Sequence, residues 1–123
     1  QVSRIIVCGH SHCGGIRALY FGGPARASNL ALWLELGREA VLPVQPSDEA
    51  LRRTEQRAVV LQLERLMGYP MVREQVEAGR LALHGWHYVI EEGEVHVFDV
   101  HSGGFLPASA SPHAGTGPYH PVG

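Results

Sequence analysis

His10 and Cys13 are the two residues of this chain whose types and spacing best suit metal chemistry. An imidazole and a thiolate three residues apart on a turn can point at one ion, and zinc favours nitrogen and sulfur ligands. Two side chains do not complete a site, because zinc takes at least three protein ligands. The spacing therefore predicts part of a zinc site, and a chance His-x-x-Cys without metal is the alternative.

The elements around this pair would place it where ligands bind. Residues 5–7 (IIV) form a short β-branched run that predicts a fully buried strand over residues 4–8. Gly9, Gly14 and Gly15 mark a tight exit from that strand. Open α/β sheets hold their ligands at the carboxyl ends of strands, which is where both side chains would lie.

Two neighbours of the pair are weaker candidates. Cys8 lies inside the apolar run, so we expect it to behave as a small buried hydrophobic residue. His12 lies on the turn between the two candidate ligands, and we expect it to face solvent.

The segments that carry these residues resemble a known family. Residues 6–15 (IVCGHSHCGG) resemble the zinc-binding segment of the β-class carbonic anhydrases. Residues 81–90 (LALHGWHYVI) resemble that family's Leu-His-Gly-Trp-x-Tyr strand, and residues 62–66 and 69–72 resemble its linking helices. The resemblance covers residues 1 to about 106, with the motifs in the family's order.

The resemblance implies a function and a set of site residues. His10 and Cys13 would bind Zn²⁺, and zinc-bound hydroxide would attack carbon dioxide to give bicarbonate. Gly14 and Gly15 would keep the substrate pocket open and offer backbone N–H groups. Tyr88 matches a tyrosine that helps to hold a regulatory bicarbonate in a subset of the family, although a core or interface role is the favoured interpretation. The family also implies a homodimer or a dimer of dimers.

One departure from the family pattern limits this interpretation. The family completes its site with an upstream Cys-x-Asp-x-Arg segment, which these 123 residues do not contain. We therefore expect the chain to be the carboxyl-terminal portion of a longer protein, with the catalytic aspartate and arginine upstream, and a degenerate relative is the alternative. Two other functions stay open: a related zinc hydrolase of carbon disulfide or carbonyl sulfide, and a non-catalytic interaction half-domain.

Composition narrows the class of protein. A chain of 123 residues with 45% hydrophobic residues is long enough for one small domain. Ten basic and twelve acidic residues leave a net charge of −2, so we expect no nucleic-acid partner. The sequence has no apolar stretch near eighteen residues, which predicts no membrane span. Two cysteines do not form a disulfide framework, which favours a reducing compartment such as the cytoplasm.

The pattern of the remaining chain predicts an α/β fold, part of a mostly parallel sheet flanked by helices, with a C-terminal antiparallel hairpin strand. Helices are expected over residues 16–21, 29–38, 47–68 and 70–76, and the two hairpin strands over 81–90 and 94–100. Trp33 is expected in the core. The apolar stripe of the long helix is wider than one core face requires, which favours burial by another chain or layer. We divide the chain into a domain over residues 1–106 and an irregular Pro/Gly/Ser-rich tail over 107–123.

Overall fold

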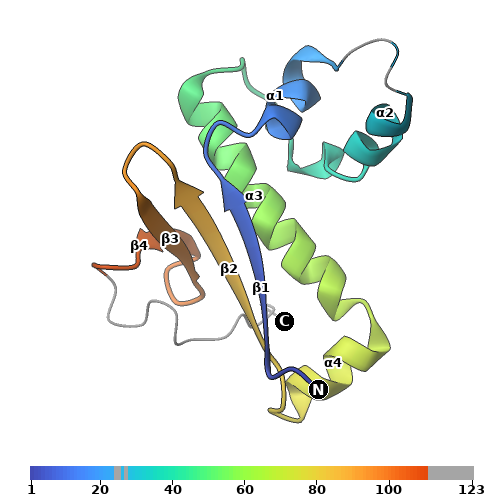
Figure 1. Ribbon diagram of the computed structural model, residues 1–123, viewed down its shortest axis with the longest axis vertical. Helices are drawn as coiled ribbons and strands as arrows, with labels where there is room; N and C mark the ends of the chain where they lie inside the picture. The colour runs from blue at the N-terminus through green and yellow to red at the C-terminus, as the bar shows by residue number, and fades with distance from the viewer. Residues whose placement is uncertain (24–25, 27, 111–123) are drawn as a thin grey trace.

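The structure is a computed structural model, and it describes residues 1–23, 26 and 28–110. It has a four-stranded sheet with one long helix across it and shorter helices at both ends of that helix (Figure 1). In chain order, the elements are β1 (Arg4–His10), α1 (Gly14–Phe21), α2 (Ser28–Glu35), the 3₁₀ turn η1 (Arg38–Ala40), α3 (Asp48–Met67), α4 (Pro70–Glu77), β2 (Ala82–Val89), β3 (Glu94–Asp99) and β4 (Gly104–Pro107).

The strands lie in the order β1-β2-β3-β4. The β1–β2 pair is parallel and the other two pairs are antiparallel, which confirms the α/β class and the hairpin strand. In the parallel pair, His10 lies opposite Tyr88. Because parallel strands end at the same edge, the loop after β1 and the turn after β2 are neighbours in space.

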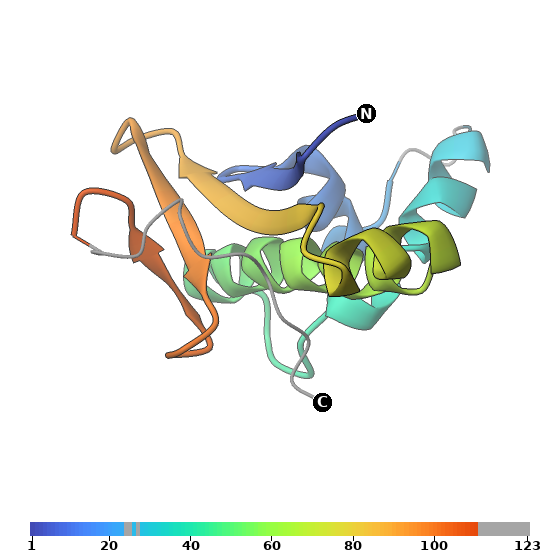
Figure 2. The same cartoon turned by 90° about the horizontal axis from the view of Figure 1, so that it is seen from below.

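Helix α3 crosses one face of this sheet, as the end-on view shows (Figure 2). Its start is capped by Ser47, whose hydroxyl accepts a hydrogen bond from the Ala50 N–H at 3.1 Å. The helix approaches the strands closely where they carry glycine. A Cβ atom at Gly9 would lie 2.8 Å from the Cγ2 of Val59, and one at Gly85 would lie 2.9 Å from a Leu63 methyl group. These two glycines therefore set the depth at which α3 packs on the sheet.

The expectation that the first strand is fully buried is wrong. Its side chains alternate between half-buried and exposed, and 43% of Ile6 is accessible to solvent. Cys8 points to the same face and is exposed, not buried as expected. The physical reason is that, in the described part of the chain, α3 covers only the face that carries Ile5 and Val7.

The second helix also differs from expectation. It ends at Glu35 instead of Arg38, and Trp33, which was expected in the core, is 65% exposed. The neighbouring Leu34 is the buried residue. Helix α2 packs on the small α1, and one short neighbour can cover only a narrow stripe of its surface.

A fourth strand, which was not predicted, ends at the first residue of the expected tail. Residues 104–107 pair with β3, with Phe105 opposite Phe98 and a ring-centroid separation of 5.4 Å. This strand crosses the boundary expected between residues 106 and 107, and residues 111–123 of the tail lie outside the described residues.

Where the chain is described, no helix is both long and apolar enough to cross a bilayer.

Candidate metal centre

The structure brings His10 and Cys13 to one cavity of about 400 Å³ between β1, α3 and the two short helices. His10 is the last residue of β1, and Cys13 immediately precedes α1. Gly15 lines the same cavity, whereas Gly14, the first residue of α1, does not. Three of the four expected site residues therefore share this space.

The hydrogen bonding of His10 fits a metal ligand. Its Nδ1 lies 2.8 Å from the carbonyl oxygen of Ser11. A carbonyl can only accept a hydrogen bond, so this contact places the proton on Nδ1 and leaves the lone pair on Nε2. Ligating histidines commonly have their second nitrogen held in this way.

Cys13 is the second candidate metal ligand among the described residues. It has extended backbone geometry, its side chain does not cap α1, and its thiol is free of any disulfide. Within the described ranges, no three His, Cys, Asp or Glu side chains are grouped closely enough to hold a metal ion. Nitrogen and sulfur are the donors that zinc prefers, so the pair fits two of the three ligands that zinc needs.

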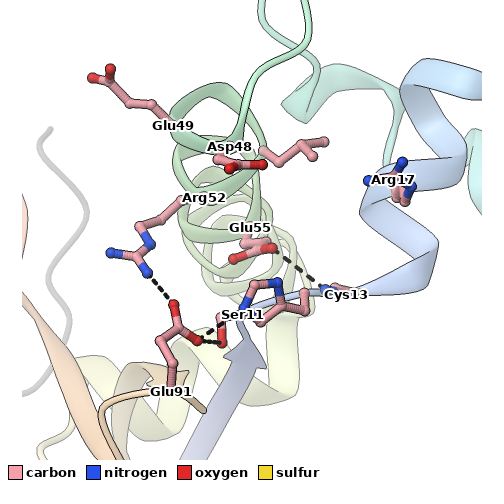
Figure 3. Close-up of a pocket in the computed structure, with 10 residues that line it drawn as sticks. Ser11, Cys13, Arg17, Asp48, Glu49, Arg52, Glu55 and Glu91 are labelled. Atoms are coloured by element: carbon pink, nitrogen blue, oxygen red, sulfur yellow. Dashed lines mark hydrogen bonds and ion pairs between the residues drawn. The ribbon is translucent and has the colours of Figure 1, made fainter.

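The loop that carries the pair is anchored through Ser11, which is 2% exposed. Its N–H donates to the Tyr88 carbonyl at 2.8 Å, and its hydroxyl accepts from the Ile90 N–H at 2.8 Å. The same hydroxyl donates to Glu91 Oε2 at 3.0 Å (Figure 3). These three bonds join the loop after β1 to the turn after β2.

His12 has a strained backbone. With a φ of 56°, it is the one non-glycine residue of positive φ in the described part of the chain. This conformation costs a residue with a Cβ about 1–2 kcal/mol, which is comparable to one or two hydrogen bonds. The His12 side chain is 73% exposed, which confirms the expectation that it faces solvent. Its Nε2 lies 3.0 Å from Glu91 Oε2.

Glu91 also bonds to helix α3, because Arg52 Nη2 lies 2.5 Å from its Oε1 (Figure 3). The pKa of the Glu91 carboxyl is lowered, first by its own backbone N–H and then by Ser11 and His12. The carboxylate is therefore the form that these donors favour.

A second anchor lies beneath Cys13. The carboxylate of Glu55, on α3, accepts a hydrogen bond from His87 Nε2 at 2.8 Å, and its other oxygen lies 3.5 Å from the Cys13 N–H. His87 is fully buried and Glu55 is 5% exposed. Sequence reasoning missed both residues. His87 could have been found from its position, because it lies between Gly85 and Val89 on the inward face of β2. A buried histidine needs a polar partner.

A polar cavity of about 470 Å³ adjoins this anchor, and Figure 3 shows the residues that line it. Cys13 and Glu55 line both cavities, so the two cavities are neighbours at these residues. The polar cavity is lined by charged and hydroxyl side chains of both signs, including Ser11, His12, Arg17, Asp48, Glu49, Arg52 and Glu91.

Two residues beside the pair have other surroundings than expected. Tyr88 is 38% exposed, so it is not a core residue, and an interface role stays a prediction. Cys8 lines the cavity of His10 and Cys13, and partial burial raises the pKa of its thiol.

Comparison with known proteins agrees with this geometry. The family model for carbonic anhydrase matches residues 1–95. Carbonic anhydrase 1 of Escherichia coli O157:H7 is 36% identical over 91% of this chain and 54% of its own length. The carbonic anhydrase of Synechocystis sp. is 35% identical over 80% of this chain and 39% of its own. The chain thus spans about half, or less, of the length of these relatives.

Solved structures show the same fold. The β-carbonic anhydrase CcaA superposes with a TM-score of 0.78 and 32% identity, over 86% of this chain and 55% of that protein. A tetrameric β-carbonic anhydrase from Sordaria macrospora gives a TM-score of 0.67 and 25% identity, over 78% of this chain and 52% of that protein. With a family match over most of its length and a His-x-x-Cys pair at one cavity, this chain belongs to the β-carbonic anhydrase family.

Proposed function

We propose that the protein is a zinc-dependent carbonic anhydrase that interconverts carbon dioxide and bicarbonate. The observation that carries the proposal is the shared cavity of His10 and Cys13, in which His10 keeps its Nε2 lone pair for a metal. Membership of the β-carbonic anhydrase family supports the same reaction. No observation favours the carbon disulfide, carbonyl sulfide or interaction-module alternatives.

Zinc would be held by His10 Nε2 and Cys13 Sγ together with a third ligand from outside the described residues. The family resemblance implies that this ligand is a cysteine from an upstream Cys-x-Asp-x-Arg segment, which also supplies the aspartate and arginine. When bound, zinc supplies a Lewis acid that lowers the pKa of water to about 7, so hydroxide is available at neutral pH.

The cavity suits a small, uncharged substrate. Its walls include the apolar side chains of Leu19, Trp33 and Leu34 beside the two ligands. Carbon dioxide has no charge to pair, so an apolar wall can take it up without a cost in lost hydration. Gly15 carries no side chain to block the space next to Cys13, whose sulfur lies 3.7 Å from the position that a Cβ would take.

Zinc content per chain, measured with the rate of carbon dioxide hydration, tests this function. The full-length protein should hold one zinc ion, and His10→Ala and Cys13→Ala should each lose both metal and activity. Cys8→Ala is the matched control, because it removes a thiol from the same cavity without removing a ligand. Full zinc occupancy in the Cys13→Ala protein would overturn the assignment.

We also propose that the protein assembles as a homodimer or a dimer of dimers. Large apolar side chains are exposed on and around the short helices, namely Phe21, Leu32, Trp33 and Leu36. Such a surface usually marks an interface, and one related structure is described as tetrameric. Sedimentation equilibrium tests this proposal, which an active monomer at micromolar concentration would overturn.

We further propose a reducing location such as the cytoplasm, which the two free thiols support.

A further inference from the structure

We propose that Glu91 is a positioning residue for the metal-binding loop, and that it acts by holding His12 in its left-handed backbone conformation. The role of the loop as a zinc site rests on the proposed function. The assignment of Glu91 rests on the contacts of its carboxylate.

The backbone of His12 controls how the two candidate ligands face each other. The chain reverses between the end of β1 at His10 and the start of α1 after Cys13, and only Ser11 and His12 lie between them. With His12 at φ 56°, both ligands line one cavity. A return of this residue to negative φ would redirect the chain that enters α1 and so move Cys13 relative to His10.

Glu91 reaches this turn from the neighbouring strand end. Its Oε2 lies 3.0 Å from the Ser11 hydroxyl and 3.0 Å from His12 Nε2, so one oxygen contacts both turn residues. Its Oε1 is bonded to Arg52 of α3 at 2.5 Å. The arginine fixes the orientation of the carboxylate and directs the second oxygen at the loop (Figure 3).

The contact between His12 and Glu91 is poorly suited to stabilising the fold as a whole. The side chains of His12 and Glu91 are 73% and 42% exposed, and ion pairs so exposed contribute little to the free energy of unfolding. The contact instead holds His12, whose backbone is strained. Loss of Glu91 should therefore change the loop and its metal affinity more than the stability of the protein.

Zinc titration of the purified full-length protein tests the proposal. Glu91→Ala should weaken zinc binding by about tenfold or more, the range usual for residues that orient a ligand. Glu91→Gln should lose less, because its amide oxygen can still accept from Ser11. Glu92→Ala is the matched control: this neighbour on the same turn bonds to His96 at 3.1 Å, and its loss should leave zinc affinity unchanged.

A rescue experiment separates backbone positioning from a general structural role. Glycine adopts positive φ readily, so His12→Gly should hold the turn without help from Glu91. In the His12→Gly protein, Glu91→Ala should weaken zinc binding by less than about threefold, since Ser11 alone loses its acceptor. An unchanged affinity in the Glu91→Ala single variant, or the same tenfold loss in the His12→Gly background, would overturn the proposal.

A readout without metal distinguishes failure of this proposal from failure of the proposed function. The distance between the amide proton and Hα of His12, which is shorter at positive φ than at negative φ, reports the sign of φ through the NMR cross-peak between these protons. Glu91→Ala, or Glu91→Gln if the alanine variant fails to fold, should lengthen this distance. A wild-type protein that has positive φ but binds no zinc would refute the zinc function and leave the Glu91 assignment intact. A distance unchanged in the variant would refute that assignment.

Discussion

Glu55 Oε1 and His87 Nε2 lie 2.8 Å apart in the interior, where they join helix α3 to the inward face of β2. Both side chains are buried, and the second oxygen of the same carboxylate lies near the Cys13 N–H. The bond therefore connects the helix, the sheet and the loop that carries the candidate metal ligands.

Breaking this bond should destabilise the protein. Glu55→Ala leaves the fully buried His87 nitrogen without its partner, at a cost of about 1–3 kcal/mol in the free energy of unfolding. Replacing both residues by leucine should cost less than the sum of the two single replacements, because neither Glu55 nor His87 is then left buried without the other. Urea denaturation measures these effects. Glu64→Ala, on an exposed position of α3, is the control and should change the free energy by no more than about 0.5 kcal/mol.

The close approach of α3 to the sheet predicts that Gly9 and Gly85 tolerate no side chain. Gly9→Ala places a methyl group 2.8 Å from Val59 Cγ2, and Gly85→Ala places one 2.9 Å from Leu63 Cδ1. Each should lower the free energy of unfolding by about 1–3 kcal/mol, since a packed helix must move to relieve the contact. Gly14→Ala is the control, because nothing lies within 4 Å of its Cβ position. Equal thermal unfolding of all three variants would contradict this account of the packing.

The two cysteines should differ in their response to alkylation. Bound zinc should protect Cys13 from iodoacetamide, whereas Cys8, which is exposed, should react whether or not zinc is present. Only the thiolate reacts, and partial burial of its sulfur raises the pKa of the Cys8 thiol. Its modification should therefore be slow at neutral pH and accelerate as the pH rises. Mass spectrometry of peptides from protein with and without zinc gives both rates, and protection of Cys8 but not of Cys13 would contradict the ligand assignment.

Acid should weaken the turn between β3 and β4. The Ser102 hydroxyl, followed by backbone N–H groups of this turn, lowers the pKa of the Asp99 carboxyl. A depressed pKa means that the folded state favours the carboxylate, so its contribution is complete above the ordinary range for aspartate, about 3.9, and is lost as the pH falls through the folded value. Asp99→Asn should therefore flatten the fall of stability below about pH 4. Chemical denaturation at a series of pH values checks this, and identical slopes for the two proteins would refute it.

The sequence by itself determined the elements whose signals are local. The start of the long helix at Ser47, the hairpin through residues 91–93 and the first strand depend on neighbouring residues, and the structure has all three, although the strand runs to His10 and not only to Cys8. The spacing of the His-x-x-Cys pair on a turn also limits where the two side chains can point, and both line one cavity, while their role as zinc ligands stays a prediction.

Only the tertiary structure decided which faces are covered and which polar groups meet. Cys8 and Trp33 have apolar surroundings in the sequence, yet they are exposed, because burial depends on which elements pack across from them. Glu55 and His87 are 32 residues apart, and Ser11 and Glu91 are 80 apart. Such pairs form only when α3 crosses the sheet and when the parallel strands β1 and β2 end at a common edge. No local pattern of residues predicts that these side chains meet. Their contacts hold the loop between His10 and Cys13 in place.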